Sequence, residues 1–223
     1  MRGPVRLPLE QLEPYLLTLP ETPAPLDWPG IFGNEQPVEI EVGCGKGLFL
    51  LTASLERPDV NFLGIEIERK YQLFTANRVA KRQLRQVRLV CTDARLFFRD
   101  YVAAGSVQAV HVYFPDPWWK TRHHKRRVFT EEFATACTRV LRPGGRLEVM
   151  SDVAEYFAVI AALLGRQTAL RPVPALASSA TYRTNFERKY RQIGKPIYAA
   201  SYEKAAGVPA TDGANPQAAS LRT

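Results

Sequence analysis

Strand-like apolar segments alternate with helix-like segments about five times along this chain, and this alternation limits the fold more than any other feature of the sequence. Short apolar runs between turn residues are typical of buried strands, and amphipathic runs are typical of helices. A repeated strand–helix order gives a parallel sheet with helices on both faces. The predicted strands span residues 38–42, 61–66, 87–91, 109–114 and 146–150, and the predicted helices span residues 48–55, 69–85, 95–101, 130–141 and 153–164. The sequence therefore predicts an α/β fold with a doubly wound, mostly parallel, Rossmann-like sheet.

Three further parts of the chain complete the predicted organisation. Residues 1–37 contain eight of the 17 prolines, so we expect residues 1–36 to form a mostly extended arm that is either draped over a body at residues 37–204 or partly disordered. Trp28 and Phe32 are its candidate anchors. Within the body, two later segments predict an antiparallel pair at the sheet edge, residues 167–173 and 196–203. Residues 205–223 have few large apolar side chains and predict a flexible tail.

An acidic residue stands at the carboxyl end of every strand in the predicted parallel sheet. The five acids are Glu41, Glu66, Asp93, Asp116 and Asp152. The carboxyl ends of parallel strands meet at one edge of the sheet, and ligands of open α/β folds bind at that edge. Five acids in equivalent positions are much harder to obtain by chance than one, so we expect a binding site there.

A glycine-rich turn, Gly-Cys-Gly-Lys-Gly at residues 43–47, follows the first predicted strand. Glycines let the backbone turn tightly and approach a ligand without interference from a Cβ atom. The turn differs from the dinucleotide fingerprint, which has its third glycine at the position of Leu48, and it lacks the Gly-Lys-Ser/Thr of a P-loop. Glu66 follows the turn by about 20 residues, which is the position of a ribose-binding carboxylate in such folds. Asp93 has two interpretations of equal weight, a helix cap or an acceptor for a ligand amine.

Residues 113–127 combine one carboxylate, two indoles and five permanent cations. Prolines on both sides of Asp116 fix the backbone, so its carboxylate is held rigidly after the fourth strand. Arginines bind phosphate and indoles stack on exposed bases, although packing within the loop explains Trp118 equally well. His123 and His124 are expected to be surface polar residues, because no acid or cysteine lies at metal-ligand spacing.

The net charge of +8 is unevenly distributed. Residues 1–42 hold two Arg against seven acids, and the remainder holds 28 Lys and Arg against 15 acids. Such an excess favours a polyanionic partner, and a solvated basic surface is an equally consistent interpretation. The three isolated cysteines and the lack of an apolar run long enough to cross a bilayer predict a reduced, cytoplasmic protein without a metal site or a membrane partner.

Taken together, these motifs closely resemble the bacterial tRNA (guanine-N7-)-methyltransferase family over roughly residues 37–204. The most specific match is Phe-Pro-Asp-Pro-Trp-x-Lys-x-Arg-His-x-Lys-Arg-Arg at residues 114–127, and further matches lie at residues 41–47, 62–66, 151–152 and 184–187. The resemblance implies a class I methyltransferase fold and S-adenosylmethionine as methyl donor. It also implies methylation of the variable-loop guanine of tRNA at N7, giving 7-methylguanosine.

The resemblance assigns roles to individual residues. It implies that Asp116 is the active-site acid, that Glu66 holds the ribose diol and that Asp93 lies on the adenine side. The implied donor-binding residues are Glu41, Gly43, Gly45, Glu66, Asp93 and Asp116. The implied substrate contacts are Lys120, Asp152, Thr184, Asn185, Phe186 and Glu187, and the candidates for RNA contact are Arg122, Lys125, Arg126 and Arg127.

Two other functions are consistent with parts of the sequence. The Asp-Pro pair at residues 116–117 resembles the Asp-Pro-Pro-aromatic loop of amino methyltransferases acting on adenine or cytosine, but the second proline is absent here. A non-catalytic RNA-binding protein with the same fold is the third alternative, and the complete set of acids argues against it. The expected partner is tRNA, and the protein is expected to be either a monomer or a homodimer.

Overall fold

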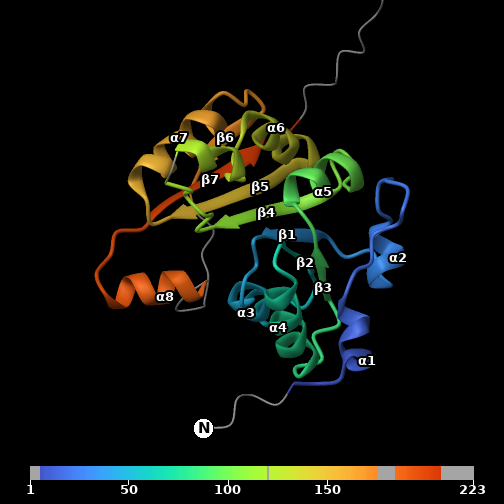
Figure 1. The fold of residues 1–223 in the computed structure, drawn as a ribbon. Helices are drawn as coiled ribbons and strands as arrows, with labels where there is room; N and C mark the ends of the chain where they lie inside the picture. Colours follow the sequence, from blue (N-terminus) through green and yellow to red (C-terminus); the bar gives the residue numbers. More distant parts are fainter. Residues whose placement is uncertain (1–5, 120, 175–183, 207–223) are drawn as a thin grey trace, which may run out of the picture.

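The computed structural model describes residues 6–119, 121–174 and 184–206, which form a seven-stranded sheet with helices on both faces (Figure 1). The strands are β1 (Val38–Val42), β2 (Asn61–Glu66), β3 (Val87–Cys91), β4 (Val107–Tyr113), β5 (Leu141–Ser151), β6 (Leu170–Val173) and β7 (Tyr198–Lys204). The α-helices are α1 (Leu9–Leu12), α2 (Trp28–Phe32), α3 (Leu48–Glu56), α4 (Arg69–Ala80), α5 (Ala94–Tyr101), α6 (Glu131–Val140), α7 (Ala154–Gly165) and α8 (Asn185–Gln192). Two 3-10 helices, η1 (Glu13–Tyr15) and η2 (Thr121–Arg126), complete the described elements.

The strand order β3-β2-β1-β4-β5-β7-β6 confirms the predicted doubly wound sheet. Strands β1 to β5 are parallel, and the chain reverses its direction across the sheet between β1 and β4. Ligands bind beside such a reversal at the carboxyl ends of the strands. The predicted antiparallel pair is present as β6 and β7, with β7 one position in from the edge and β6 at the edge itself.

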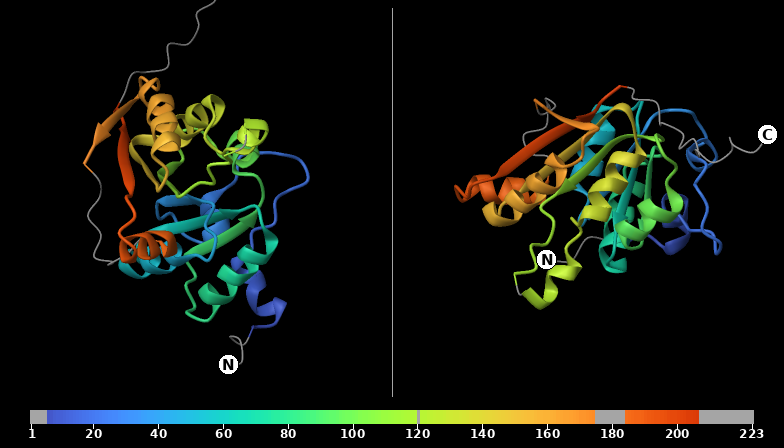
Figure 2. Two further views of the ribbon diagram at one scale, coloured as in Figure 1. Left: turned by 60° about the vertical axis from the view of Figure 1, so that its left-hand side comes forward. Right: turned by 90° about the horizontal axis from the view of Figure 1, so that it is seen from above.

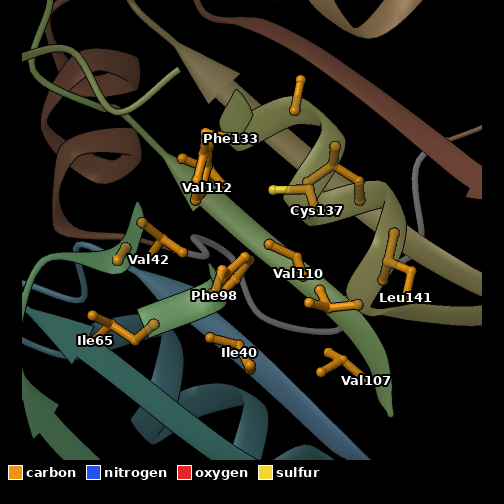
Figure 3. Close-up of a cluster of buried hydrophobic side chains, with 14 of the residues drawn as sticks. Ile40, Val42, Ile65, Phe98, Val107, Val110, Val112, Phe133, Cys137 and Leu141 are labelled. Carbon is orange, nitrogen blue, oxygen red and sulfur yellow. The ribbon is translucent and has the colours of Figure 1, made fainter. Parts of the chain in front are cut away.

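Each face of the sheet has its own hydrophobic core. Helices α5, α6 and α7 cover one face, where Phe98 and Phe133 pack against Ile40 and Val110 of the strands (Figure 3). Helices α3 and α4 cover the other face, with Phe49 among its buried side chains. Side chains alternate between the two faces along a strand, so the acids at positions 39 and 41 point towards the α3 side. Both are buried, as are the other residues of β1.

The N-terminal arm is more structured than the predicted extended segment. Leu12 and Tyr15 are buried in the core under α4, whereas Trp28 and Phe32 are buried in the opposite core, which confirms the two predicted anchors. The backbone N–H of Leu17 donates to the carbonyl of Leu89 at 2.8 Å. The arm therefore runs along the outer edge of β3. Helix α2 forms because Asp27 caps its start and Gly33 takes the left-handed conformation at its end.

Two of the differences between the predicted and observed element boundaries have a clear local cause. Helix α4 ends at Ala80 instead of Arg85, because Gln83 takes a left-handed conformation with φ 53° and turns the chain towards β3. The Arg-Pro-Gly-Gly segment at residues 142–145 ends α6 as predicted, but it bulges within β5: the pairing with β4 jumps from Leu141 to Arg146. The predicted tail lies outside the described residues beyond residue 206.

A buried polar chain connects β1 to the end of β4. Glu39 is 2% exposed, and its carboxylate accepts from Arg57 Nη1 at 2.5 Å, Gln108 Nε2 at 3.1 Å and His111 Nε2 at 2.8 Å. The other ring nitrogen of His111 lies 2.9 Å from the Tyr113 hydroxyl. Buried charges are tolerated only with such partners. This chain therefore fixes the last residue of β4, from which the Asp116 loop departs.

We predict that Glu39→Gln destabilises the protein in a pH-dependent way. Burial raises the pKa of Glu39, but the interactions with His111 and Arg57 outweigh it and lower the pKa from 4.5 to about 2. A carboxyl whose pKa is lowered by folding stabilises the folded protein at any pH above its ordinary pKa. This stabilisation disappears as the pH falls towards 2. The variant should be less stable than wild type by roughly 3 kcal/mol at pH 7, and the gap should close in acid. Urea unfolding between these pH values measures the stability difference, with the exposed Glu35→Gln as control. A difference that does not vary with pH would contradict a lowered pKa for Glu39.

Candidate functional site

The glycine-rich turn between β1 and α3 is held from two sides and open on a third. The N–H groups of Gly43 and Cys44 donate to the carbonyl of Ile65 at 2.9 and 3.0 Å. Thr75 of α4 donates to the carbonyl of Gly45 at 2.8 Å, and a Cβ at Gly47 would lie 2.2 Å from the Thr75 methyl group. At Gly43, by contrast, no atom lies within 4 Å of the Cβ position. The turn thus offers backbone to a ligand on this open side.

Glu66 at the end of β2 is fixed by the turn. Its two oxygens accept from the N–H of Gly45 at 2.8 Å and from the N–H of Glu68 at 3.0 Å. An ionised carboxylate has about four acceptor positions, so each oxygen retains a position for a further donor. The structure therefore brings Glu66 together with the glycine turn, and its contact with a ribose stays a prediction.

Glu41 is the unusual member of the site. It is 4% exposed, and its Oε2 is the buried side-chain polar atom without a hydrogen-bond partner among the described residues. Burial, and next the charge of Glu66, raise the pKa of Glu41 well above its ordinary value. A buried acceptor without a partner costs free energy. In a protein that binds a ligand, such an atom is a natural place for a ligand's positive charge or hydrogen-bond donor.

Asp93 follows β3 and caps α5. Its carboxylate accepts from the backbone N–H of Arg95 at 2.9 Å and from the guanidinium of the same residue at 2.6 Å. These bonds with Arg95 hold the pKa of Asp93 below its ordinary value. The cap interpretation is thus confirmed, and an additional bond from Asp93 to a ligand stays a prediction.

The loop after β4 presents Asp116 to solvent. Phe114 and Trp118 take left-handed conformations, with φ 54° and 42°, which side chains other than glycine rarely adopt. A loop held in this way is a common feature of functional sites. Asp116 lines an open hollow of about 370 Å³ together with Pro117, Trp118, Trp119 and His123. This volume is at the low end of the roughly 300–1,000 Å³ of ligand pockets.

The cations that follow Asp116 divide into two groups. Arg127 donates from Nε to the carbonyl of Pro117 at 2.7 Å and lies 4.7 Å from the Tyr156 ring centre. These contacts show that the Arg127 guanidinium helps to hold the loop, and its contact with RNA stays a prediction. Arg122 and Arg126 are exposed, as an RNA contact requires. Lys120 and the side chain of Lys125 lie outside the described residues.

The two indoles also separate. The guanidinium of Arg126 lies 5.0 Å from the Trp118 ring centre, and the Trp118 ring meets His123 edge-on at 5.8 Å. These contacts favour loop packing for Trp118. Trp119 is 68% exposed at the rim of the hollow, so it is the indole available for stacking on a base.

Helix α8 brings the predicted substrate segment beside the Asp116 loop. The rings of Phe186 and Tyr190 lie 5.9 and 5.5 Å from the ring of Phe114. Thr184 caps the helix by accepting from the N–H of Glu187 at 3.0 Å, and buried Glu187 pairs with Arg191. These two residues therefore build the helix start, whereas Phe186 is 51% exposed.

Two other predicted substrate residues have partners of their own. The carboxylate of Asp152, at the end of β5, forms an ion pair with Lys195. Asn185 Oδ1 accepts from Arg188 Nη2 at 3.3 Å. Because Met150 pairs with Tyr113 in the sheet, Asp152 and the Asp116 loop leave adjacent strands.

Sequence reasoning missed the residues of α4 that support the turn. Arg78 donates to the carbonyl of Lys46, one residue from the carbonyl that Thr75 holds. In the sequence, Arg78 belongs to a basic helix face that either is solvated or touches a polyanion, and its bond to the turn leaves no local signal because the two residues are 32 positions apart. Among the residues that the structure describes, no group of three acids, histidines or cysteines is arranged to hold a metal, and no helix is long and apolar enough to span a membrane.

Comparison with solved structures shows the class of fold. The aminoglycoside resistance methyltransferase NpmB1 is 18% identical with a TM-score of 0.55, covering 78% of this chain and 90% of its own. An rRNA methylase from Streptococcus thermophilus is 14% identical with a TM-score of 0.52, and the match covers 78% of this chain and 89% of that one. The chain therefore has the class I methyltransferase fold. A family model described as "Putative methyltransferase" matches residues 35–200.

Comparison with curated proteins identifies the family. The tRNA (guanine-N(7)-)-methyltransferase of Rhodopirellula baltica is 41% identical, covering 88% of this chain and 77% of its own. The tRNA (guanine-N(7)-)-methyltransferase of Geobacter metallireducens is 32% identical, and the match covers 89% of this chain and 96% of that one. The chain belongs to the tRNA (guanine-N(7)-)-methyltransferase family.

We predict that Glu41→Gln stabilises the free protein at alkaline pH. A carboxyl with a raised pKa costs stability once the pH exceeds its ordinary value of 4.5, and the cost grows until the raised pKa is reached. The variant should gain roughly 1–3 kcal/mol over wild type at pH 8 and little at pH 5. Urea unfolding at both pH values measures the gain. Glu66→Gln is the matched control and should lose stability, because Glu66 accepts two backbone bonds; a Glu41→Gln protein that is less stable at pH 8 would refute the prediction.

Proposed function

We propose that this protein transfers the methyl group of S-adenosylmethionine to N7 of the variable-loop guanine in tRNA. The observation that carries the proposal is the open glycine turn with the unpartnered Glu41 oxygen beside it, in a chain of this family. The turn and the Asp116 loop leave β1 and β4, which are neighbouring strands at the reversal of the sheet. Donor and acceptor sites therefore share one edge.

The residues at the glycine turn fit the donor. S-adenosylmethionine carries a ribose diol, an ammonium group and a sulfonium group. Glu66 retains acceptor positions for the diol, and the buried Glu41 carboxylate lacks the positive charge or donor that the ligand supplies. The donor would be held by Glu41, Gly43, Gly45, Glu66, Asp93 and Asp116, and when bound it supplies an electrophilic methyl group on a positively charged sulfur.

Asp116 is proposed to act through its charge and position. Guanine N7 carries an in-plane lone pair, so no base has to remove a proton before the attack. Positive charge moves onto the purine during transfer, and the Asp116 carboxylate at the hollow stabilises charge developing there. The rigid loop orients the base for an in-line reaction.

The RNA side is proposed to include the exposed members of the loop and of α8. Trp119 is available to stack on a base, and Arg122 and Arg126 to bind phosphates. Lys120, Asp152 and residues 184–187 are proposed substrate contacts on their position in the family motifs. The protein is further proposed to act in the cytoplasm, as a monomer or homodimer.

Locating the methyl group tests this function. The protein is incubated with unmodified tRNA and labelled S-adenosylmethionine, and the tRNA is digested with nucleases and examined by mass spectrometry. We expect 7-methylguanosine in the variable loop. Label on the amino group of adenine or cytosine would support the amino methyltransferase alternative. A lack of donor binding in calorimetry would support a non-catalytic RNA-binding protein.

We predict that Asp116→Asn lowers turnover by roughly 10²–10³-fold at saturating donor and tRNA, as expected for the loss of one electrostatic contact to the transition state. The Asp116 side chain is exposed, and no hydrogen bond or ion pair of this side chain supports the described part of the fold. The free energy of unfolding should therefore be unchanged. Single-turnover kinetics and thermal unfolding measure the two effects. Turnover equal to that of wild type would remove Asp116 from the reaction.

A further inference from the structure

Three arginines from two helices cluster beside the glycine turn. Arg78 lies in the last turn of α4, Arg82 just beyond the end of that helix, and Arg188 in α8. Arg82 Nη1 donates to the carbonyl of Arg78 at 3.2 Å. Burial, and then the charges of Arg82 and Arg188, lower the pKa of Arg78, so both of these guanidinium groups lie near that of Arg78. Residues 78 and 188 are far apart in the sequence, and only the fold brings their charges together.

The acid next to Arg188 in the sequence is engaged elsewhere, because Glu187 pairs with Arg191. Within the described chain, the three arginines donate to uncharged oxygens: the carbonyl of Lys46 for Arg78, the carbonyl of Arg78 for Arg82, and the Asn185 side chain for Arg188. Among the ion pairs of the described chain, none neutralises the cluster. Like charges gathered without a counter-charge are typical of a surface that binds an anion.

The cluster lies between the two halves of the proposed site. Arg78 holds the carbonyl of Lys46 in the glycine turn. Arg188 belongs to α8, whose rings contact Phe114 at the start of the Asp116 loop. Figure 1 and the left view of Figure 2 place α8 on the side of the sheet covered by α3 and α4. An anion here would contact the molecule between the donor turn and the substrate helix.

We propose that Arg78, Arg82 and Arg188 form a binding site for RNA backbone phosphates next to the nucleotide being methylated. This inference rests on the proposed tRNA function and extends the RNA surface from the Asp116 loop to α4 and α8. Exposed Lys46 adds a fourth cation at the same place. Arginine suits this role because its planar group binds phosphate through two parallel hydrogen bonds. Through its bond to Lys46, Arg78 also connects bound RNA with the turn that holds the donor.

The salt dependence of tRNA binding tests this site. The double variant Arg82→Gln/Arg188→Gln leaves Arg78 and its bond to the turn in place. Each lost phosphate contact should reduce the slope of log affinity against log salt concentration by roughly 0.7–0.9, so the double variant should lose about 1.5 in slope. Affinity is measured by fluorescence anisotropy with labelled tRNA between about 50 and 200 mM salt. Calorimetric affinity for S-adenosylmethionine should equal that of wild type.

Two further variants make the result specific. Arg142→Gln removes an exposed arginine bonded to Gln108 at the opposite edge of the sheet, and its slope should match wild type. Arg82→Lys/Arg188→Lys keeps the charge and should restore most of the slope. A double Gln variant with the wild-type slope would overturn the site while leaving tRNA methylation by the wild type intact. If wild-type protein neither binds nor methylates tRNA, the proposed function fails and this inference fails with it.

Discussion

The structure depends on the burial of two carboxylates on one side of the central strand. Glu39 and Glu41 both point from β1 towards the α3 side, and the protein treats them differently. Glu39 is neutralised by Arg57 and His111, and this chain of bonds extends to Tyr113 at the end of β4. Glu41 keeps an oxygen without a partner among the described residues. One acid thus stabilises the fold and supports the loop, while the other leaves a buried oxygen without a hydrogen-bond partner at the cost of stability.

Much of the fold followed from the sequence because parallel sheets carry local signals. Apolar runs identified β1 to β5, and the rule that parallel strands end at one edge placed the acids together without knowledge of any contact. The structure joins Glu66 to Gly45 as this rule requires. Lys120 lies outside the part of the chain that the structure describes, so its contact with the substrate stays a prediction. The family resemblance supplied the donor and the substrate, which spacing alone does not specify.

The sequence failed where partners come from distant segments. Nothing local marks Arg127 as a residue that donates to the carbonyl of Pro117. Nor does the pattern of β1 distinguish a solvated acid from Glu39, whose partner His111 is 72 residues away. The short helices of the arm were missed because its prolines suggested extended chain, whereas Pro29 is accommodated in the first turn of α2, where a missing N–H costs nothing.

The arm alongside β3 has a consequence for how the protein behaves in a crowded solution. An uncovered outer strand presents free N–H and C=O groups to any other chain and invites pairing between molecules. Here Leu17 occupies the Leu89 carbonyl, and Leu16 bridges to the same residue. A proline-rich segment is well suited to this position, because each proline lacks the donor that a further strand would need. The proline-rich arm therefore covers the outer edge of the sheet and opposes pairing of that edge with other molecules.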